Sequence, residues 1–173
     1  MTIISSMAPV IGPEANVLIL GSMPGIKSLE KQQYYGNPRN HFWSIISELL
    51  NTDITTWDYE QKCSFLIENK IALWDVLASC ERKGSLDSAI RQEEMNDLNS
   101  LIQDFPTIKW IGLNGTKAYQ SFQKYRKTKE FPAMPYTKLP SSSPVPGKNV
   151  KTFEEKVISW HVVHHYLNLT GEK

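Results

Sequence analysis

Asn16-Val-Leu-Ile-Leu-Gly21 is a continuous apolar run that ends in glycine. A run of this kind, without alternating polar residues, is typical of a strand that is covered on both faces. Two similar runs follow at Ile71–Asp75 and Ile108–Leu113, and a weaker fourth strand is expected to end near Leu139. Such strands predict a parallel sheet that lies between two layers of helices.

Helical signals separate the strands. Asn37-Pro38 predicts the start of a helix, because asparagine is a good N-cap and proline suits the first helical position. Apolar residues then recur with helical spacing up to Leu50. The remaining helices are expected at Tyr59–Glu68, Leu98–Phe105, Ala118–Tyr125 and Phe153–His164. Strands that alternate with helices in this way favour an α/β fold.

The composition is that of an ordinary globular protein. The 173 residues suit one domain (1–173), 40% of them are hydrophobic, and the formal net charge is +1. No apolar run approaches the roughly 20 residues that cross a bilayer, and the first residues lack the pattern of a secretory signal. Cys63 and Cys80 are too few for a disulfide framework or a four-thiolate metal site. We therefore expect reduced thiols and a cytoplasmic location, with no membrane partner.

Basic residues gather in one part of the chain although the net charge is small. They are Lys117, Lys124, Arg126, Lys127, Lys129 and Lys138, opposed there by Glu130. Such a stretch can face the phosphates of a nucleic acid, but it is more often a solvated surface. Both interpretations stay open at this point.

The loops that follow the predicted strands are the expected place for a site, because open parallel sheets bind ligands beyond the carboxyl ends of their strands. The segments are Gly21–Gly36, Asp75–Asp87, Asn114-Gly115 and Pro140–Gly147. They are rich in Ser, Asn, Gly or Pro rather than in core residues. A site is therefore expected where the four segments converge.

Gln33-Tyr-Tyr-Gly-Asn-Pro-Arg-Asn-His-Phe-Trp43 places two aromatic residues directly before a helix. A ring at Tyr34 or Tyr35 can stack on a flat ligand such as a nucleobase. Asn40 is expected in the first turn of the helix, where its amide can orient a water, bind a base or merely cap the helix.

Two other loops carry polar or flexible residues. Gly21-Ser-Met-Pro-Gly25 permits close approach of the backbone to a ligand but lacks the pattern of a nucleotide-binding loop. Leu139-Pro-Ser-Ser-Ser-Pro-Val-Pro-Gly147 is stiffened by proline, and its hydroxyls can hold phosphates. Each loop taken alone could be a simple connector. The four histidines lack zinc-ligand spacing, and no serine lies in a nucleophile elbow.

Together these segments resemble the uracil-DNA glycosylase superfamily. Gly21–Gly25 looks like the first motif of that family, and Tyr35–Trp43 resembles the stretch that follows in its mismatch-specific and hypoxanthine-acting branches. Leu139–Pro144 matches the place of the second motif, the DNA-intercalation loop. The branch most similar to this sequence is hypoxanthine-DNA (deoxyinosine) glycosylase, to which Ala72–Val76 and Ser85–Ser88 also look similar. The resemblance runs over most of the chain.

The resemblance implies a three-layer α/β/α sandwich with a four-stranded parallel sheet, and a monomer that needs no cofactor or metal. It implies a substrate of double-stranded or single-stranded DNA that contains a deaminated base. The site residues that it implies are Asn40 and Ser22 (catalytic), Tyr35, Met23, Asp75 and Asn114 (base-binding), and Ser141, Ser142, Ser143 and Pro144 (DNA-binding).

Two departures from the family pattern bear on the reaction. The first motif carries Ser22-Met23 and no catalytic Asn or Asp, and Leu139 stands where many members carry a histidine. We therefore expect excision of hypoxanthine, or of uracil, to depend on positioning and electrostatic stabilisation. The alternatives are a mismatch-specific uracil/thymine-DNA glycosylase, a non-catalytic module that binds damaged DNA, and a small-molecule hydrolase.

Overall fold

A four-stranded parallel sheet forms the centre of the protein. The computed structural model describes residues 3–144 and 150–167. The strands follow the order β3 (Ile71–Asp75), β2 (Val17–Gly21), β6 (Trp110–Asn114) and β7 (Tyr136–Leu139). All three pairings are parallel. The four predicted strands and their parallel arrangement are therefore confirmed.

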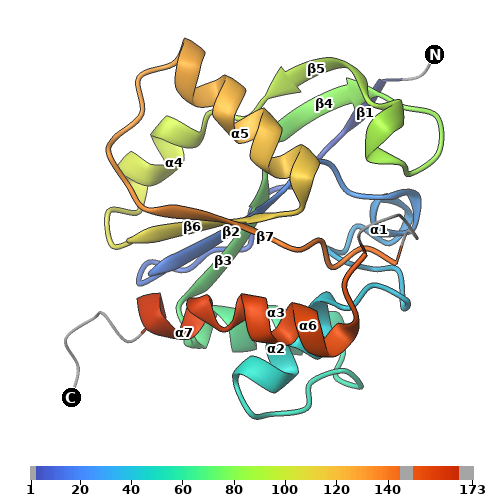
Figure 1. The fold of residues 1–173 in the computed structure, drawn as a ribbon, viewed down its shortest axis with the longest axis vertical. Helices are drawn as coiled ribbons and strands as arrows, with labels where there is room; N and C mark the ends of the chain where they lie inside the picture. Colours follow the sequence, from blue (N-terminus) through green and yellow to red (C-terminus); the bar gives the residue numbers. More distant parts are fainter. Residues whose placement is uncertain (1–2, 145–149, 168–173) are drawn as a thin grey trace.

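Helices cover both faces of this sheet, as Figure 1 shows. On one face lie α4 (Leu98–Asp104) and α5 (Thr116–Thr128). On the other lie α2 (Phe42–Leu49), α3 (Tyr59–Glu68), α6 (Phe153–Trp160) and α7 (Val162–Leu167). The three-layer α/β/α sandwich is confirmed.

Strand β2 is buried along its whole length because its side chains alternate between two cores. Leu18 and Leu20 belong to the core that includes α4 and α5, whereas Val17 and Ile19 belong to the core that includes α2, α3 and α6. Full burial of one such side chain stabilises the fold by about 1.5–3 kcal/mol. The uninterrupted apolar run of this strand follows from its place between the two helical layers.

A second, antiparallel sheet stands beside the first. Its strands follow the order β1 (Ile3–Ser5), β4 (Leu77–Glu81) and β5 (Arg91–Met95). The expectation that the chain from Asp75 to Asp87 is a loop is wrong over β4, which begins two residues after β3 ends. Because both β4 and β5 are partly exposed, their sequences lack the apolar pattern that indicated the central strands.

Two loops of the carboxyl edge contain short helices, α1 (Ile26–Lys31) and the 3₁₀ helix η1 (Asp87–Ala89). The predicted start of α2 at Asn37 is also wrong. Its N-cap is His41, and the Asn37 Oδ1 atom instead accepts a hydrogen bond of 3.0 Å from the Arg39 backbone N–H. Asn37-Pro38 thus forms a turn before the helix.

The basic stretch on α5 is partly neutralised. Lys117 pairs with Glu93 of β5, and the Lys124 Nζ atom lies 3.7 Å from the other carboxylate oxygen of the same residue. No helix in the described part of the chain has the length and apolar character needed to cross a membrane.

Candidate active site

Four residues meet at the carboxyl edge of the sheet. Asn114 ends β6, and its Nδ2 atom donates to the Tyr35 hydroxyl at 3.2 Å. Asp75 ends β3 in register with Gly21, the last residue of β2. A methyl group on Gly21 would lie 2.7 Å from Asp75 Oδ1 and 3.5 Å from the Tyr35 hydroxyl oxygen. Glycine is therefore required for this approach. We name Gly21, Tyr35, Asp75 and Asn114 the strand-end cluster.

Asp75 is a buried carboxyl group, only 3% exposed. Its Oδ2 atom accepts a hydrogen bond of 2.7 Å from the Ser6 hydroxyl. Burial, helped by the nearby Asp87 carboxylate and opposed by the Ser6 hydrogen bond and the charge of Arg82, raises the pKa of Asp75 to about 7. The ion pairs found among the described residues do not include Asp75. Its neutral form is therefore prominent at physiological pH.

Tyr35 is held in an uncommon backbone conformation, with φ at 56°. Its ring stacks on Phe42, with 4.1 Å between the centroids and 18° between the planes. Burial, and then the charge of Asp75, raise the pKa of the Tyr35 phenol, which stays neutral. Left-handed backbone at a residue other than glycine is often retained at functional sites. The adjacent Tyr34 is different, because it is buried and its hydroxyl donates to the Ala8 carbonyl oxygen at 3.0 Å.

Asn40 lies in the turn before α2. The prediction that it lies in the first helical turn is therefore wrong. Its Oδ1 atom accepts a hydrogen bond of 2.9 Å from the Phe42 backbone N–H. Among residues 3–144 and 150–167, no group accepts a hydrogen bond from its Nδ2 atom. Asn40 and Tyr35 both line a cavity of about 210 Å³. The side chain thus uses its oxygen on the backbone N–H of Phe42, the first residue of α2, and leaves its amide N–H groups available to a ligand.

Ser142 joins three segments of the site. Its backbone N–H donates to Asn114 Oδ1 at 2.9 Å, and its hydroxyl accepts from Asn114 Nδ2 at 2.9 Å. Its carbonyl oxygen accepts from the His41 backbone N–H at 2.9 Å. Only 1% of Ser142 is exposed, so its side chain positions the loop instead of facing a phosphate.

The rest of this loop lies closer to the surface. The Ser141 hydroxyl accepts a hydrogen bond of 3.0 Å from the Ser143 backbone N–H. Gly115, with φ at 99°, approaches Ser141 so closely that an added methyl group would lie 3.1 Å from its Cβ atom. Pro144 is half-buried, and residues 145–147 of the predicted loop lie outside the described residues. Ser141 is exposed and Ser143 is half-buried, and the DNA-binding role predicted for both stays a prediction.

Ser22 and Met23 direct their side chains elsewhere. The Ser22 hydroxyl donates to Asp87 Oδ1 at 2.7 Å. The Met23 side chain is buried in the core that includes α4 and α5. Because both side chains are already engaged inside the protein, a role for these two residues in base capture rests on their backbone.

Two polar residues next to the site carry no sequence pattern that singles them out. Ser6 follows the first strand and reaches Asp75 across 69 positions of sequence. Arg82 is buried, and its Nη2 atom donates to the Pro24 carbonyl oxygen at 2.6 Å. These contacts depend on the pairing of β1 with β4, which the sequence did not reveal.

A model of the uracil DNA glycosylase superfamily matches residues 8–163, a span that includes the whole strand-end cluster, Asn40 and Ser142. The chain belongs to the uracil DNA glycosylase superfamily. This membership confirms the resemblance indicated by the sequence motifs. The roles of the individual residues stay predictions, supported by the geometry above.

Relatives of this superfamily member carry more specific names. A hypoxanthine DNA glycosylase of Methanosarcina acetivorans is 38% identical over 159 residues, which cover 91% of this chain and 95% of that protein. A hypoxanthine DNA glycosylase of Methanosarcina barkeri is 39% identical over 110 residues, which cover 64% of this chain and 70% of that protein. A solution NMR structure from Methanosarcina acetivorans, described as a uracil DNA glycosylase, aligns with a TM-score of 0.81 and 34% identity over 96% of this chain and 99% of that one.

Proposed function

We propose that this protein excises hypoxanthine from DNA by hydrolysing the N-glycosidic bond, and that it leaves an abasic site. The observation that carries the proposal is the strand-end cluster, which places an aromatic ring, a buried carboxyl group and an amide around one glycine. The similarity to two proteins named hypoxanthine DNA glycosylase supports this choice of base. Uracil is the second candidate base, because it presents the same lactam edge.

The target base has to leave the DNA stack before it can react. Tyr35 is positioned to receive it, because Phe42 supports one face of the ring and Asn114 fixes the hydroxyl. A ring that is already fixed loses little conformational freedom when a base stacks on it. A mispaired base costs less to flip than a paired one, which favours deaminated bases at the first step.

Asp75 can distinguish a deaminated base from its parent. Hypoxanthine and uracil carry a carbonyl oxygen where adenine and cytosine carry an amino group. A neutral carboxyl group can donate a hydrogen bond to that carbonyl oxygen, with Oδ2 held by Ser6 and Oδ1 directed toward Gly21. An amino group at that position is itself a donor, so it cannot accept the hydrogen bond from the Asp75 O–H. The two donors would be left unpaired, and an unpaired polar group is costly in a buried site.

The chemical step needs a group that stabilises negative charge on the departing base. Cleavage passes through a state with positive charge on the sugar, and the available N–H groups of Asn40 can donate to the base or hold the attacking water. A neutral Asp75 places no second negative charge beside the base. No proton abstraction by a first-motif carboxylate is required in this scheme.

The test is a substrate panel with purified protein. Duplexes that contain deoxyinosine, deoxyuridine or mispaired thymidine, each opposite all four bases, are incubated and then cleaved at abasic sites with alkali. We expect deoxyinosine to be excised fastest and deoxyadenosine not at all. Faster release of uracil or thymine from G·U or G·T pairs would favour a mismatch-specific glycosylase. Tight binding without any abasic product would indicate a non-catalytic module.

Removal of the Tyr35 ring is expected to weaken base capture. Stacking of a base on an aromatic side chain contributes about 1–3 kcal/mol, so Tyr35→Ala should raise the enzyme concentration for half-maximal single-turnover excision by roughly 5- to 150-fold. Tyr35→Phe keeps the ring and removes only the bond from Asn114, so its effect should be smaller. Equal behaviour of Tyr35→Ala and the parent protein would contradict stacking.

A further inference from the structure

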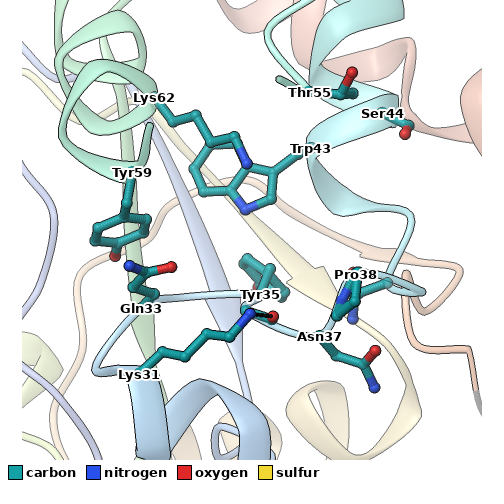
Figure 2. Close-up of a pocket in the computed structure, with 12 residues that line it drawn as sticks. Lys31, Gln33, Tyr35, Asn37, Pro38, Trp43, Ser44, Thr55, Tyr59 and Lys62 are labelled. Atoms are coloured by element: carbon teal, nitrogen blue, oxygen red, sulfur yellow. Dashed lines mark hydrogen bonds between the residues drawn. The ribbon is translucent and has the colours of Figure 1, made fainter. Parts of the chain in front are cut away.

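A cavity adjoins the strand-end cluster. It lies between the end of α1, the loop of residues 33–40, and the starts of α2 and α3 (Figure 2). Tyr35 of the cluster lines it, whereas Gly21, Asp75 and Asn114 do not. Asn40 lines it as well, so the loop of residues 33–40 contacts both this cavity and, through the Tyr35 hydroxyl, the rest of the cluster. An occupant of this cavity would therefore contact the loop that presents Asn40.

The cavity is positively charged. Lys31 enters it from α1 and Lys62 enters it from α3, as Figure 2 shows. None of the described residues that line it is acidic, and the ion pairs within the described part of the chain involve other lysines. Burial, and then the positive charge of Lys31, lower the pKa of Lys62. Two like charges near one another, without a counter-ion, favour the binding of an anion.

Both ammonium groups are held in place by neighbouring groups. The Lys31 Nζ atom donates to the Gly36 carbonyl oxygen at 2.9 Å. The Lys62 Nζ atom lies 5.2 Å from the centroid of the Trp43 ring. Asn37 also lines the cavity, and because its Oδ1 atom is occupied by Arg39, its amide N–H groups are the part that can serve an anion. Cations and donors around a small cavity suit a phosphate group.

We propose that the cavity between Lys31 and Lys62 binds one phosphate of the DNA backbone close to the flipped nucleotide. The inference rests on the proposed function, which brings DNA to this edge of the sheet. A phosphate held here fixes the register of the strand against the loop that carries Tyr35 and Asn40. The sequence did not indicate these lysines, because they come from two elements that only the fold brings together.

The test uses an undamaged duplex with a fluorescent label, and anisotropy is measured between 50 and 200 mM salt. In the double variant Lys31→Gln/Lys62→Gln, the Kd at low salt should rise about tenfold. The slope of log affinity against log salt concentration should become shallower by about 1, the value for loss of one phosphate contact. Lys109→Gln is the matched control, because Lys109 is exposed beside the start of β6, at the opposite edge of the sheet.

A second duplex, with one deoxyinosine and one uncharged methylphosphonate that is moved step by step along the strand carrying deoxyinosine, locates the phosphate. At one position the methylphosphonate should weaken DNA binding by the parent protein, and it should have no further effect on DNA binding by the double variant. The inference is overturned if the double variant binds like Lys109→Gln, or if no such position exists. It also fails if the double variant loses binding of inorganic phosphate in calorimetry while its DNA affinity stays that of the parent. Because the duplex of the anisotropy experiment is undamaged, absence of excision would defeat the proposed function without deciding that test.

Discussion

Replacement of Asn40 by alanine is expected to lower the single-turnover rate constant for deoxyinosine excision by a factor of about 10²–10³. One well-placed donor to developing negative charge contributes roughly 3–4 kcal/mol to a reaction barrier. The Nδ2 atom of Asn40 is such a donor, because its N–H groups are not used by the described residues. The measurement is made with enzyme in excess over a deoxyinosine duplex, so that binding does not limit the rate.

A second variant separates this role from helix capping. Asn40→Ala also removes the acceptor for the Phe42 backbone N–H, which should lower stability by about 1 kcal/mol. Asn40→Ser keeps a capping oxygen and removes the amide donor. It should recover the stability but not the rate. If Asn40→Ala retains a rate within a few-fold of the parent, the assigned role of Asn40 is wrong.

Asp75→Asn is expected to stabilise the protein, and more so at higher pH. The pKa of Asp75 rises from its ordinary value of 3.8 to about 7 in the fold, so the folded state holds the proton more tightly than the unfolded chain. The stability that this carboxyl group contributes is full below pH 4 and is lost as the pH rises toward 7. A rise in the pKa from 3.8 to about 7 corresponds to a change on the order of 4 kcal/mol in the free energy of unfolding.

Urea unfolding of both proteins at pH 5 and pH 8 measures the effect. The free energy of unfolding of Asp75→Asn minus that of the parent should be larger at pH 8 than at pH 5. The amide oxygen can still accept the hydrogen bond from Ser6, so the variant keeps that contact. Asp87, whose pKa burial also raises, is present in both proteins and therefore does not produce the difference. The same difference at both pH values would show that Asp75 does not titrate in this range.

The central sheet could be predicted because its strands are buried on both faces and read as unbroken apolar runs. The bounds of α3 also agree with the prediction, since Asp58 and Gln61 form a capping box at its start. Strands β4 and β5 could not be predicted, because partly exposed strands mix polar and apolar residues. Asn37-Pro38 satisfies the rules for a helix start as well as those for a turn, and the fold uses the turn.

The segments that the motifs singled out lie together in the fold. Parallel register alone places Asp75 beside Gly21, which is why strand ends were a reliable guide. Side-chain direction was not predictable in the same way. Ser22 turns toward Asp87, and Ser142 is buried against Asn114, although both lie in the expected loops. Partners that come from distant segments, such as Ser6, carry no local pattern.

The bonds that Ser142 makes have a consequence for how this protein searches DNA. Its contacts tie the second-motif loop to the end of β6 and to the residue that precedes α2. Segments that are already fixed in the free protein lose little entropy on association, and they reach each new stretch of duplex in the same shape. Before Asp75 meets the base, the choice between a normal and a damaged nucleotide then depends on how easily that nucleotide leaves the helix, and much less on rearrangement of the protein.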